Sequence, residues 1–137
     1  MLKVELLEGA KMPTKAHPGD AGWDLYAYET PRFVRGEVFT VSTGCKFEIP
    51  EGYYGRVADR SSMALKGFHV VGGVADCTYR GIVKVMLIYF GNRTVEINEG
   101  DKIAQLIITK IHEGGIEEVE KVDKTERGDG GFGSSGK

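Results

Sequence analysis

The chain has few cysteines and histidines, and each shortage argues against a class of protein. Its 137 residues include only two cysteines, Cys45 and Cys77, so a fold held together by disulfides is excluded. The three histidines, His17, His69 and His112, have no Cys or His neighbour at the spacing of metal ligands, which argues against a structural zinc site.

Long apolar runs and a strong net charge are missing as well. No run reaches the length of a membrane span, and no charged segment followed by an apolar one opens the chain. A net charge of −2 offers no general attraction to nucleic acid or to an anionic membrane. We therefore expect a soluble, cytoplasmic protein with no targeting segment and with no nucleic-acid or membrane partner.

What the chain does contain is β-strand pattern. Twenty glycines and four prolines, with short β-branched runs between them, indicate many turns and little helix. Strands are predicted at 3–7, 23–28, 37–41, 46–49, 53–58, 83–90, 94–97 and 102–111. The run 83–90 is almost entirely apolar, as expected for a strand buried on both faces. Only 61–66 looks helical, with serines able to cap it, so an all-β barrel or sandwich of about ten strands is predicted.

The segment 73–81 is polar and rich in turn residues, and it lies between two apolar runs. It predicts a tight hairpin that lines a pocket. Asp76, Tyr79 and Arg80 supply a carboxylate, an aromatic face and a guanidinium, and the flanking glycines let the main chain approach a ligand closely. This combination suits a nucleobase with its sugar. Taken alone, the segment fits equally well an ordinary hairpin whose polar side chains face water.

After Glu126 the composition changes to a glycine-rich tail, 127–137, whose only large apolar residue is Phe132. Such a tail cannot form a core, so we expect a β domain at 1–126 and a flexible arm at 127–137. A glycine-serine terminus is often merely flexible. Arg127, the unhindered main-chain N–H groups and the two serine hydroxyls also suit a phosphate, and Phe132 suits stacking on a base. An arm ordered by its ligand satisfies both interpretations.

Three other segments carry candidate ligand-binding side chains. Asp20 and Asp24 flank a strand start, where a carboxylate can hold metal-bound water, although a turn acid and a solvent-facing acid fit as well. Ser61 and Ser62 open the predicted helix, whose first N–H groups attract anions, but Ser61 alone would simply be an N-cap. Gln105 stands among apolar residues and needs a partner if it is buried, unless it lies on the polar face of its strand.

These five segments, in this order and spacing, resemble the five motifs of the trimeric dUTPases, the deoxyuridine 5'-triphosphate nucleotidohydrolases, over about residues 3–137. The resemblance implies a jelly-roll-like fold and a homotrimer with three sites at subunit interfaces, each closed by a C-terminal arm. It implies hydrolysis of dUTP to dUMP and pyrophosphate by attack of water on the α-phosphate. That reaction limits uracil incorporation into DNA and supplies dUMP for thymidylate synthesis.

The resemblance also implies roles for individual residues. Asp76 would orient and deprotonate the water, and Gln105 would contact the water and phosphates. The nucleotide would be bound by Arg60, Ser61, Ser62, Gly73, Val74, Asp76, Tyr79, Gln105, Arg127, Phe132, Gly133, Ser134 and Ser135. Within this set the Tyr79 ring would pack under the deoxyribose, and Phe132 would stack on uracil. The implied cofactor is Mg²⁺, held mainly by the triphosphate, with Asp24 reaching its water shell.

The chain departs from the family pattern at four positions. Asp59 stands where proline is usual, Ser62 where glycine is usual, Ala75 where isoleucine is common and Ile82 where glutamate is common. These departures bear on local packing and on the affinity for nucleotide, and none of them removes a catalytic group.

Two related functions are weighed against hydrolysis of dUTP. The dCTP deaminases share the fold, but their deaminating glutamate falls where this chain has Met86, which cannot shuttle protons. The other is a dUTPase-like trimer that binds nucleotide in order to regulate. The presence of Asp76, Gln105 and the Arg127 arm favours the enzyme.

Overall fold

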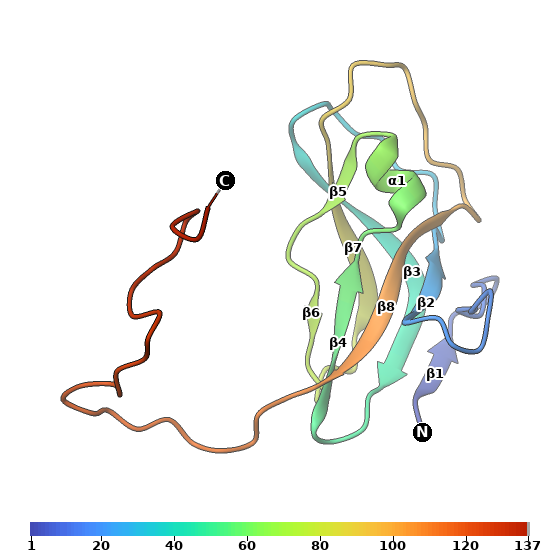
Figure 1. The fold of residues 1–137 in the computed structure, drawn as a ribbon. Helices are drawn as coiled ribbons and strands as arrows, with labels where there is room; N and C mark the ends of the chain where they lie inside the picture. The colour runs from blue at the N-terminus through green and yellow to red at the C-terminus, as the bar shows by residue number, and fades with distance from the viewer. Residues whose placement is uncertain (137) are drawn as a thin grey trace.

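Two antiparallel four-stranded sheets pack face to face in the computed structural model, which describes residues 1–136 (Figure 1). One sheet has the order β1 (Lys3–Leu6), β3 (Val38–Glu48), β7 (Ile82–Tyr89) and β5 (Phe68–Val70). The other has the order β2 (Gly22–Tyr26), β8 (Lys102–Lys110), β4 (Tyr53–Ala58) and β6 (Val74–Ala75). The short helix α1 (Ser61–Leu65) connects β4 to β5. This jelly-roll-like sandwich confirms the predicted all-β class.

The core lies between the sheets and is filled by every second residue of the strands. Leu25, Val41 and Leu87 are completely buried in it. Strand β7 was predicted to be buried on both faces, and that prediction is wrong. Its inward side chains are buried, but Lys84 and Met86 are exposed on the outer face. The outward side chains of this strand are partly apolar because they line a hollow, described below.

The strands predicted at 37–41 and 46–49 are one continuous strand, β3, with an irregularity in register between Ser42 and Lys46. Thr43 stabilises the irregular stretch, because its buried hydroxyl donates a hydrogen bond to Val83 O at 2.7 Å. The strand predicted at 94–97 is absent from the described residues. Ile97 is buried in the core there, but no neighbouring strand pairs with that segment.

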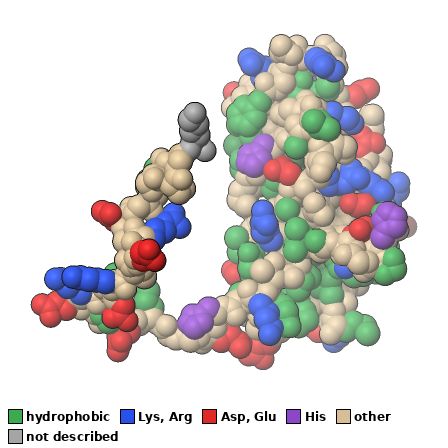
Figure 2. Space-filling model, viewed as in Figure 1, with side chains coloured by type: hydrophobic (Ala, Val, Ile, Leu, Met, Phe, Trp, Pro, Cys, Tyr) green, Lys and Arg blue, Asp and Glu red, His purple; other side chains and the backbone are tan. Residues whose placement is uncertain are grey.

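The chain leaves the sandwich after β8, and residues 111–129 are exposed throughout. Residues 111–136 run apart from the sandwich, and the charged side chains among them lie between Glu113 and Asp129 (Figures 1 and 2). Ordered strand structure therefore ends at Lys110, and the division of the chain at residue 126 stays a prediction. Lys137, the last residue of the predicted arm, lies outside the described residues. No helix in residues 1–136 is long and apolar enough to cross a membrane.

Candidate functional site

The segment 73–81, which the sequence predicts to be a hairpin and which is called the hairpin segment below, forms one wall of a hollow of about 320 Å³, whose opposite wall is the outer face of β7. Its lining includes Gly73, Val74, Asp76, Tyr79 and Met86. Asp76 is exposed on the rim, and Met86 supplies a thioether to the opposite wall. The segment thus lines a pocket, as the sequence indicates, but the predicted hairpin is wrong, because β6 pairs with β4 whereas β7 pairs with β3 and β5 in the other sheet.

Glycine is required at position 73 because the chain of β4 passes very close. Gly73 has a φ of +101°, and a Cβ there would lie 2.6 Å from Val57 O. Its carbonyl accepts a hydrogen bond from Val57 N at 2.7 Å. The glycine therefore serves close packing of the hairpin on its own sheet, in a conformation that other residues rarely adopt.

The Tyr79 ring is held in place by the chain that follows it. Its hydroxyl donates a hydrogen bond to Ile82 O at 2.9 Å, and a Cβ at Gly81 would collide with that hydroxyl. A turn hydrogen bond from Tyr79 N to Asp76 O, 3.0 Å long, holds the main chains of these two residues close together. The hollow therefore presents one carboxylate and one anchored aromatic ring.

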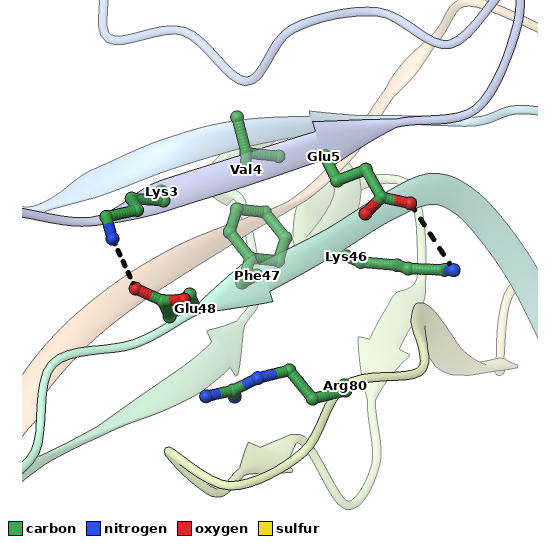
Figure 3. Close-up of a pocket in the computed structure, with 7 residues that line it drawn as sticks. All are labelled: Lys3, Val4, Glu5, Lys46, Phe47, Glu48 and Arg80. Atoms are coloured by element: carbon green, nitrogen blue, oxygen red, sulfur yellow. Dashed lines mark ion pairs between the residues drawn. The ribbon is translucent and has the colours of Figure 1, made fainter.

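Arg80 does not share this hollow, although the sequence places it beside Tyr79. Its guanidinium donates to Cys77 O at 2.6 Å and lines a separate hollow of about 350 Å³ against β1 and β3 (Figure 3). Lys3 lies 2.7 Å from Glu48 there and lowers the pKa of that carboxyl, first as a hydrogen-bond donor and then by its charge. Arg80 adds a smaller effect of the same sign on the pKa.

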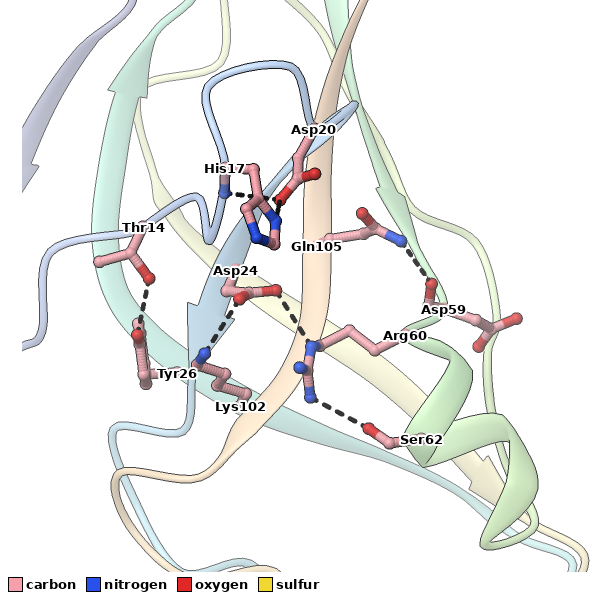
Figure 4. A network of polar contacts seen from close by, with 10 residues as sticks. All are labelled: Thr14, His17, Asp20, Asp24, Tyr26, Asp59, Arg60, Ser62, Lys102 and Gln105. Carbon is pink, nitrogen blue, oxygen red and sulfur yellow. Dashed lines mark hydrogen bonds and ion pairs between the residues drawn. The ribbon is translucent and has the colours of Figure 1, made fainter.

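A second group of site candidates meets at the start of α1 (Figure 4). Asp24 on β2 is 15% exposed and lies between two cations, with Arg60 Nε 3.0 Å from Oδ1 and Lys102 Nζ 3.2 Å from Oδ2. Arg60 Nη1 also donates to Ser62 Oγ at 3.1 Å. Gln105 pairs with Asp24 across the β2–β8 ladder, and its Nε2 donates to Asp59 O at 2.8 Å.

Asp20, the other acid of that motif, does not join the network. Its Oδ2 accepts a hydrogen bond from His17 N at 2.9 Å, as a turn acid does. The serines do not cap α1 either. The N-cap is Arg60, which makes no side-chain capping bond, and Ser61 is exposed. The predicted serine cap is therefore wrong.

Lys102 is a site residue that sequence reasoning missed. It stands at the first position of β8, where a lysine normally faces solvent. The register of β2 against β8, with an irregularity between Leu25 and Tyr26, brings it to Asp24 instead. It also lines, together with Arg60, Ser62 and Lys66, a hollow of about 290 Å³ beside the network.

The arm residues lie away from both groups in this chain. Phe132 is fully exposed, and Arg127 Nε donates to Gly130 O at 2.8 Å within the arm itself. Gly133, Ser134 and Ser135 form a turn at the end of the arm. One chain therefore brings together Asp24, Arg60, Ser62 and Gln105 but not the arm.

No group of three or more His, Cys, Asp or Glu side chains within residues 1–136 is placed to hold a metal ion. Asp24 is a single carboxylate beside cations that suit phosphates. Mg²⁺ keeps several waters and uses one or two carboxylates plus substrate phosphates. The residues present therefore fit an ion that arrives with a triphosphate.

Comparison with known proteins decides the family. The dUTPase family model matches residues 8–136. The chain belongs to the dUTPase family. Its relatives include the deoxyuridine 5'-triphosphate nucleotidohydrolase of monkeypox virus, 46% identical over 127 residues that cover 93% of this chain and 84% of the relative. The enzyme of the same name from vaccinia virus (strain Copenhagen) is also 46% identical, over 93% of this chain and 86% of the relative. The predicted enzyme class, hydrolysis of dUTP to dUMP, is confirmed.

Solved dUTPase structures share the fold over almost the whole chain. The Staphylococcus bacteriophage 80alpha dUTPase with dUpNHpp has a TM-score of 0.89 and 29% identity and covers 99% of this chain and 98% of its own. A mutant dUTPase from phage phi11 of S. aureus has a TM-score of 0.80 and 28% identity, with 88% and 97% covered. The phi11 structure is described as revealing the coordination of a structural Mg(II) ion.

Proposed function

We propose that this dUTPase releases pyrophosphate from dUTP by using Asp76 to orient a water and accept its proton as the water attacks the α-phosphorus. The observation that carries the site is the network of Asp24, Arg60, Ser62 and Gln105, because three separate chain segments deliver the family's motif residues to one place (Figure 4). A positioned general base contributes roughly 10²–10⁴-fold to a rate. Asp76 lies exposed on the rim of its hollow, where a water has access.

The hollow beside the hairpin is the proposed nucleoside site. Uracil pairs with the main chain from Gly73 to Tyr79, including Val74, and the Tyr79 ring packs under the deoxyribose. A fixed pattern of main-chain donors and acceptors rejects cytosine, because cytosine would leave a polar group unpaired. The anchoring of Tyr79 by Ile82 O supports this assignment, since a rigid ring excludes a 2′-hydroxyl better than a mobile one.

The phosphates are proposed to lie over Arg60, Ser61 and Ser62, with Gln105 toward the water. Arg60 is already desolvated in part and paired with Asp24, so its charge is held in place before the nucleotide binds. Mg²⁺ would come with the triphosphate and reach Asp24 through water, and its charge would stabilise the phosphates as pyrophosphate leaves.

A homotrimer is proposed to complete each site. The hairpin hollow and the hollow beside Arg60 and Lys102 have no lining residue in common. The arm contributes to neither. Arg127, Ser134 and Ser135 are therefore proposed to grip the distal phosphates, with Phe132 on uracil and Gly133 allowing the turn, at a site formed with other copies. A cytoplasmic location is proposed on the strength of the sequence alone.

The test is pyrophosphate release measured with dUTP, dCTP, dTTP and UTP. Release from dUTP alone, with kcat/KM far above the other three, is the expected result. Binding of dUTP without turnover would favour a regulatory trimer instead. Release of ammonia from dCTP would favour a deaminase, which the thioether of Met86 at the hollow argues against.

A further inference from the structure

Asp59 connects the two sheets at the point where the chain passes from one to the other. It follows β4 directly and precedes Arg60. Its Oδ1 accepts a hydrogen bond from Val70 N at 2.6 Å, and its Oδ2 lies 2.8 Å from His69 Nδ1. Val70 ends β5, which belongs to the other sheet. One carboxylate therefore ties the end of β4 to the end of β5.

The Val70 N–H needs this partner because β5 is an edge strand. β5 pairs with β7 on one side, and within residues 1–136 no strand lies on its other side. An unpaired main-chain N–H in a buried residue such as Val70 is unfavourable, and an ionised acceptor makes a short, strong bond to it. The carboxylate thus gives the Val70 N–H of the edge strand a hydrogen-bond acceptor and also holds β5 close to the end of β4.

The same residue holds the phosphate side of the site through its main chain. Asp59 O accepts the hydrogen bond from Gln105 Nε2 at 2.8 Å. Beyond Val70 the chain turns into Gly73, which is bonded back to Val57 of β4 at 2.7 Å. Hydrogen bonds and chain continuity therefore link Asp59 to Gln105, to Arg60 and to the start of the segment 73–81.

We propose that Asp59 is a positioning residue for the dUTPase reaction. Its carboxylate holds the strand that leads into the hairpin, while its carbonyl and its neighbour Arg60 hold the phosphate side. The inference rests on the proposed function of those parts. Proline, the residue usual at this position in the family pattern, has no side-chain acceptor for Val70 N or His69, so this chain uses a side-chain tie of its own.

The test compares Asp59→Ala, Asp59→Asn and the control Glu29→Ala in the full chain. Glu29 is exposed, belongs to neither hollow, and likewise accepts a main-chain bond, from Ser42 N at 3.1 Å. Asp59→Ala is expected to lower kcat for dUTP by about ten- to a hundredfold, the effect of a small misplacement of reacting groups, and to weaken dUMP binding. Asp59→Asn keeps the acceptor for Val70 N and should retain most of the wild-type kcat and most of the affinity for dUMP. Glu29→Ala should change neither by more than about twofold.

Several outcomes decide the matter. If Asp59 only stabilises the fold, Asp59→Ala will have a lower melting temperature, but its kcat per folded protein and its dissociation constant for dUMP will equal those of the wild type. That result would overturn the proposal. If Asp59→Ala is insoluble, Asp59→Glu replaces it, because the extra methylene displaces the acceptor while keeping the charge. Wild-type turnover in Asp59→Glu would then overturn the proposal. Failure of the proposed function can be distinguished from failure of this inference, because in that case the wild-type protein itself would release no pyrophosphate from dUTP.

Discussion

Arg60 and Asp24 form an ion pair with a separation of 3.0 Å, although Arg60 is the N-cap of α1 and Asp24 belongs to β2. Arg60, which is proposed to bind phosphate, thus holds Asp24, which is proposed to reach the water shell of the metal ion. Each keeps the other oriented before the nucleotide binds, which reduces the ordering that binding would otherwise require.

Asp76→Asn should keep nucleotide binding and slow turnover by roughly 10²–10⁴-fold, because an amide cannot accept the proton of the attacking water. The measurement is kcat for dUTP together with the dissociation constant of dUMP. Near-normal turnover in Asp76→Asn would show that another group is the general base.

Asp24→Asn should raise the Mg²⁺ concentration needed for half-maximal turnover, since the neutral amide attracts the hydrated ion less strongly than the carboxylate. Asp20→Asn is the matched control, because Asp20 bonds to His17 and lies outside the network. Titration of Mg²⁺ after chelation measures both variants. Equal midpoints for Asp24→Asn and wild type would contradict a role for Asp24 at the metal.

Tyr79→Ala should lose discrimination between dUTP and UTP, because the ring that is proposed to exclude a 2′-hydroxyl is gone. Tyr79→Phe keeps the ring and loses only the bond to Ile82 O, so it should retain most of the discrimination. The ratio of kcat/KM for the two nucleotides is the measurement. If Tyr79→Ala leaves that ratio unchanged, the sugar is read elsewhere.

Truncation after Glu126 should leave thermal stability almost unchanged, because residues 127–136 are outside the core. Turnover should collapse, since the arm is proposed to close the site and hold the distal phosphates. Phe132→Ala should reproduce part of the loss, whereas Lys137→Ala should matter little. Full kcat/KM in the truncated protein would show that the site is complete without its arm.

The two cysteines provide a test of the nucleoside hollow. Burial raises the pKa of Cys45, so at pH 8 that thiol is mostly protonated and should alkylate slowly. Cys77 is partly exposed and should react first; it lies in the turn between Asp76 and Tyr79, which line the hollow, but does not line the hollow itself. Saturating dUMP should slow alkylation of Cys77 and leave Cys45 unaffected. Mass spectrometry of the alkylated peptides measures both rates. An equal rate for Cys77 with and without dUMP would show that the nucleotide does not cover the turn 76–79.

The fold class could be predicted because turn residues and alternating apolar residues report directly on short strands. The error at 94–97 has a physical cause. Periodicity reports that Ile97 is buried, but it does not report whether a partner strand lies alongside. In β7 the apolar outer side chains suggested burial on both faces, whereas Met86 in fact lines the nucleoside hollow.

The site residues that sequence reasoning missed depend on register. Lys102 reaches Asp24 only because β2 pairs with β8 in one particular alignment. Asp59 contacts Val70, eleven positions away, only because β4 and β5 end side by side on different sheets. A motif lists the residues within one segment, so contacts between segments stay invisible until the strands are placed.

The segment 111–129 is exposed throughout and is therefore free of the packing constraints that govern the sandwich. A substitution there removes no core contact and should leave the free energy of unfolding almost unchanged. If the arm holds the distal phosphates as proposed, substitutions at 127–129 would alter turnover while the amount of folded protein in the cell stays the same.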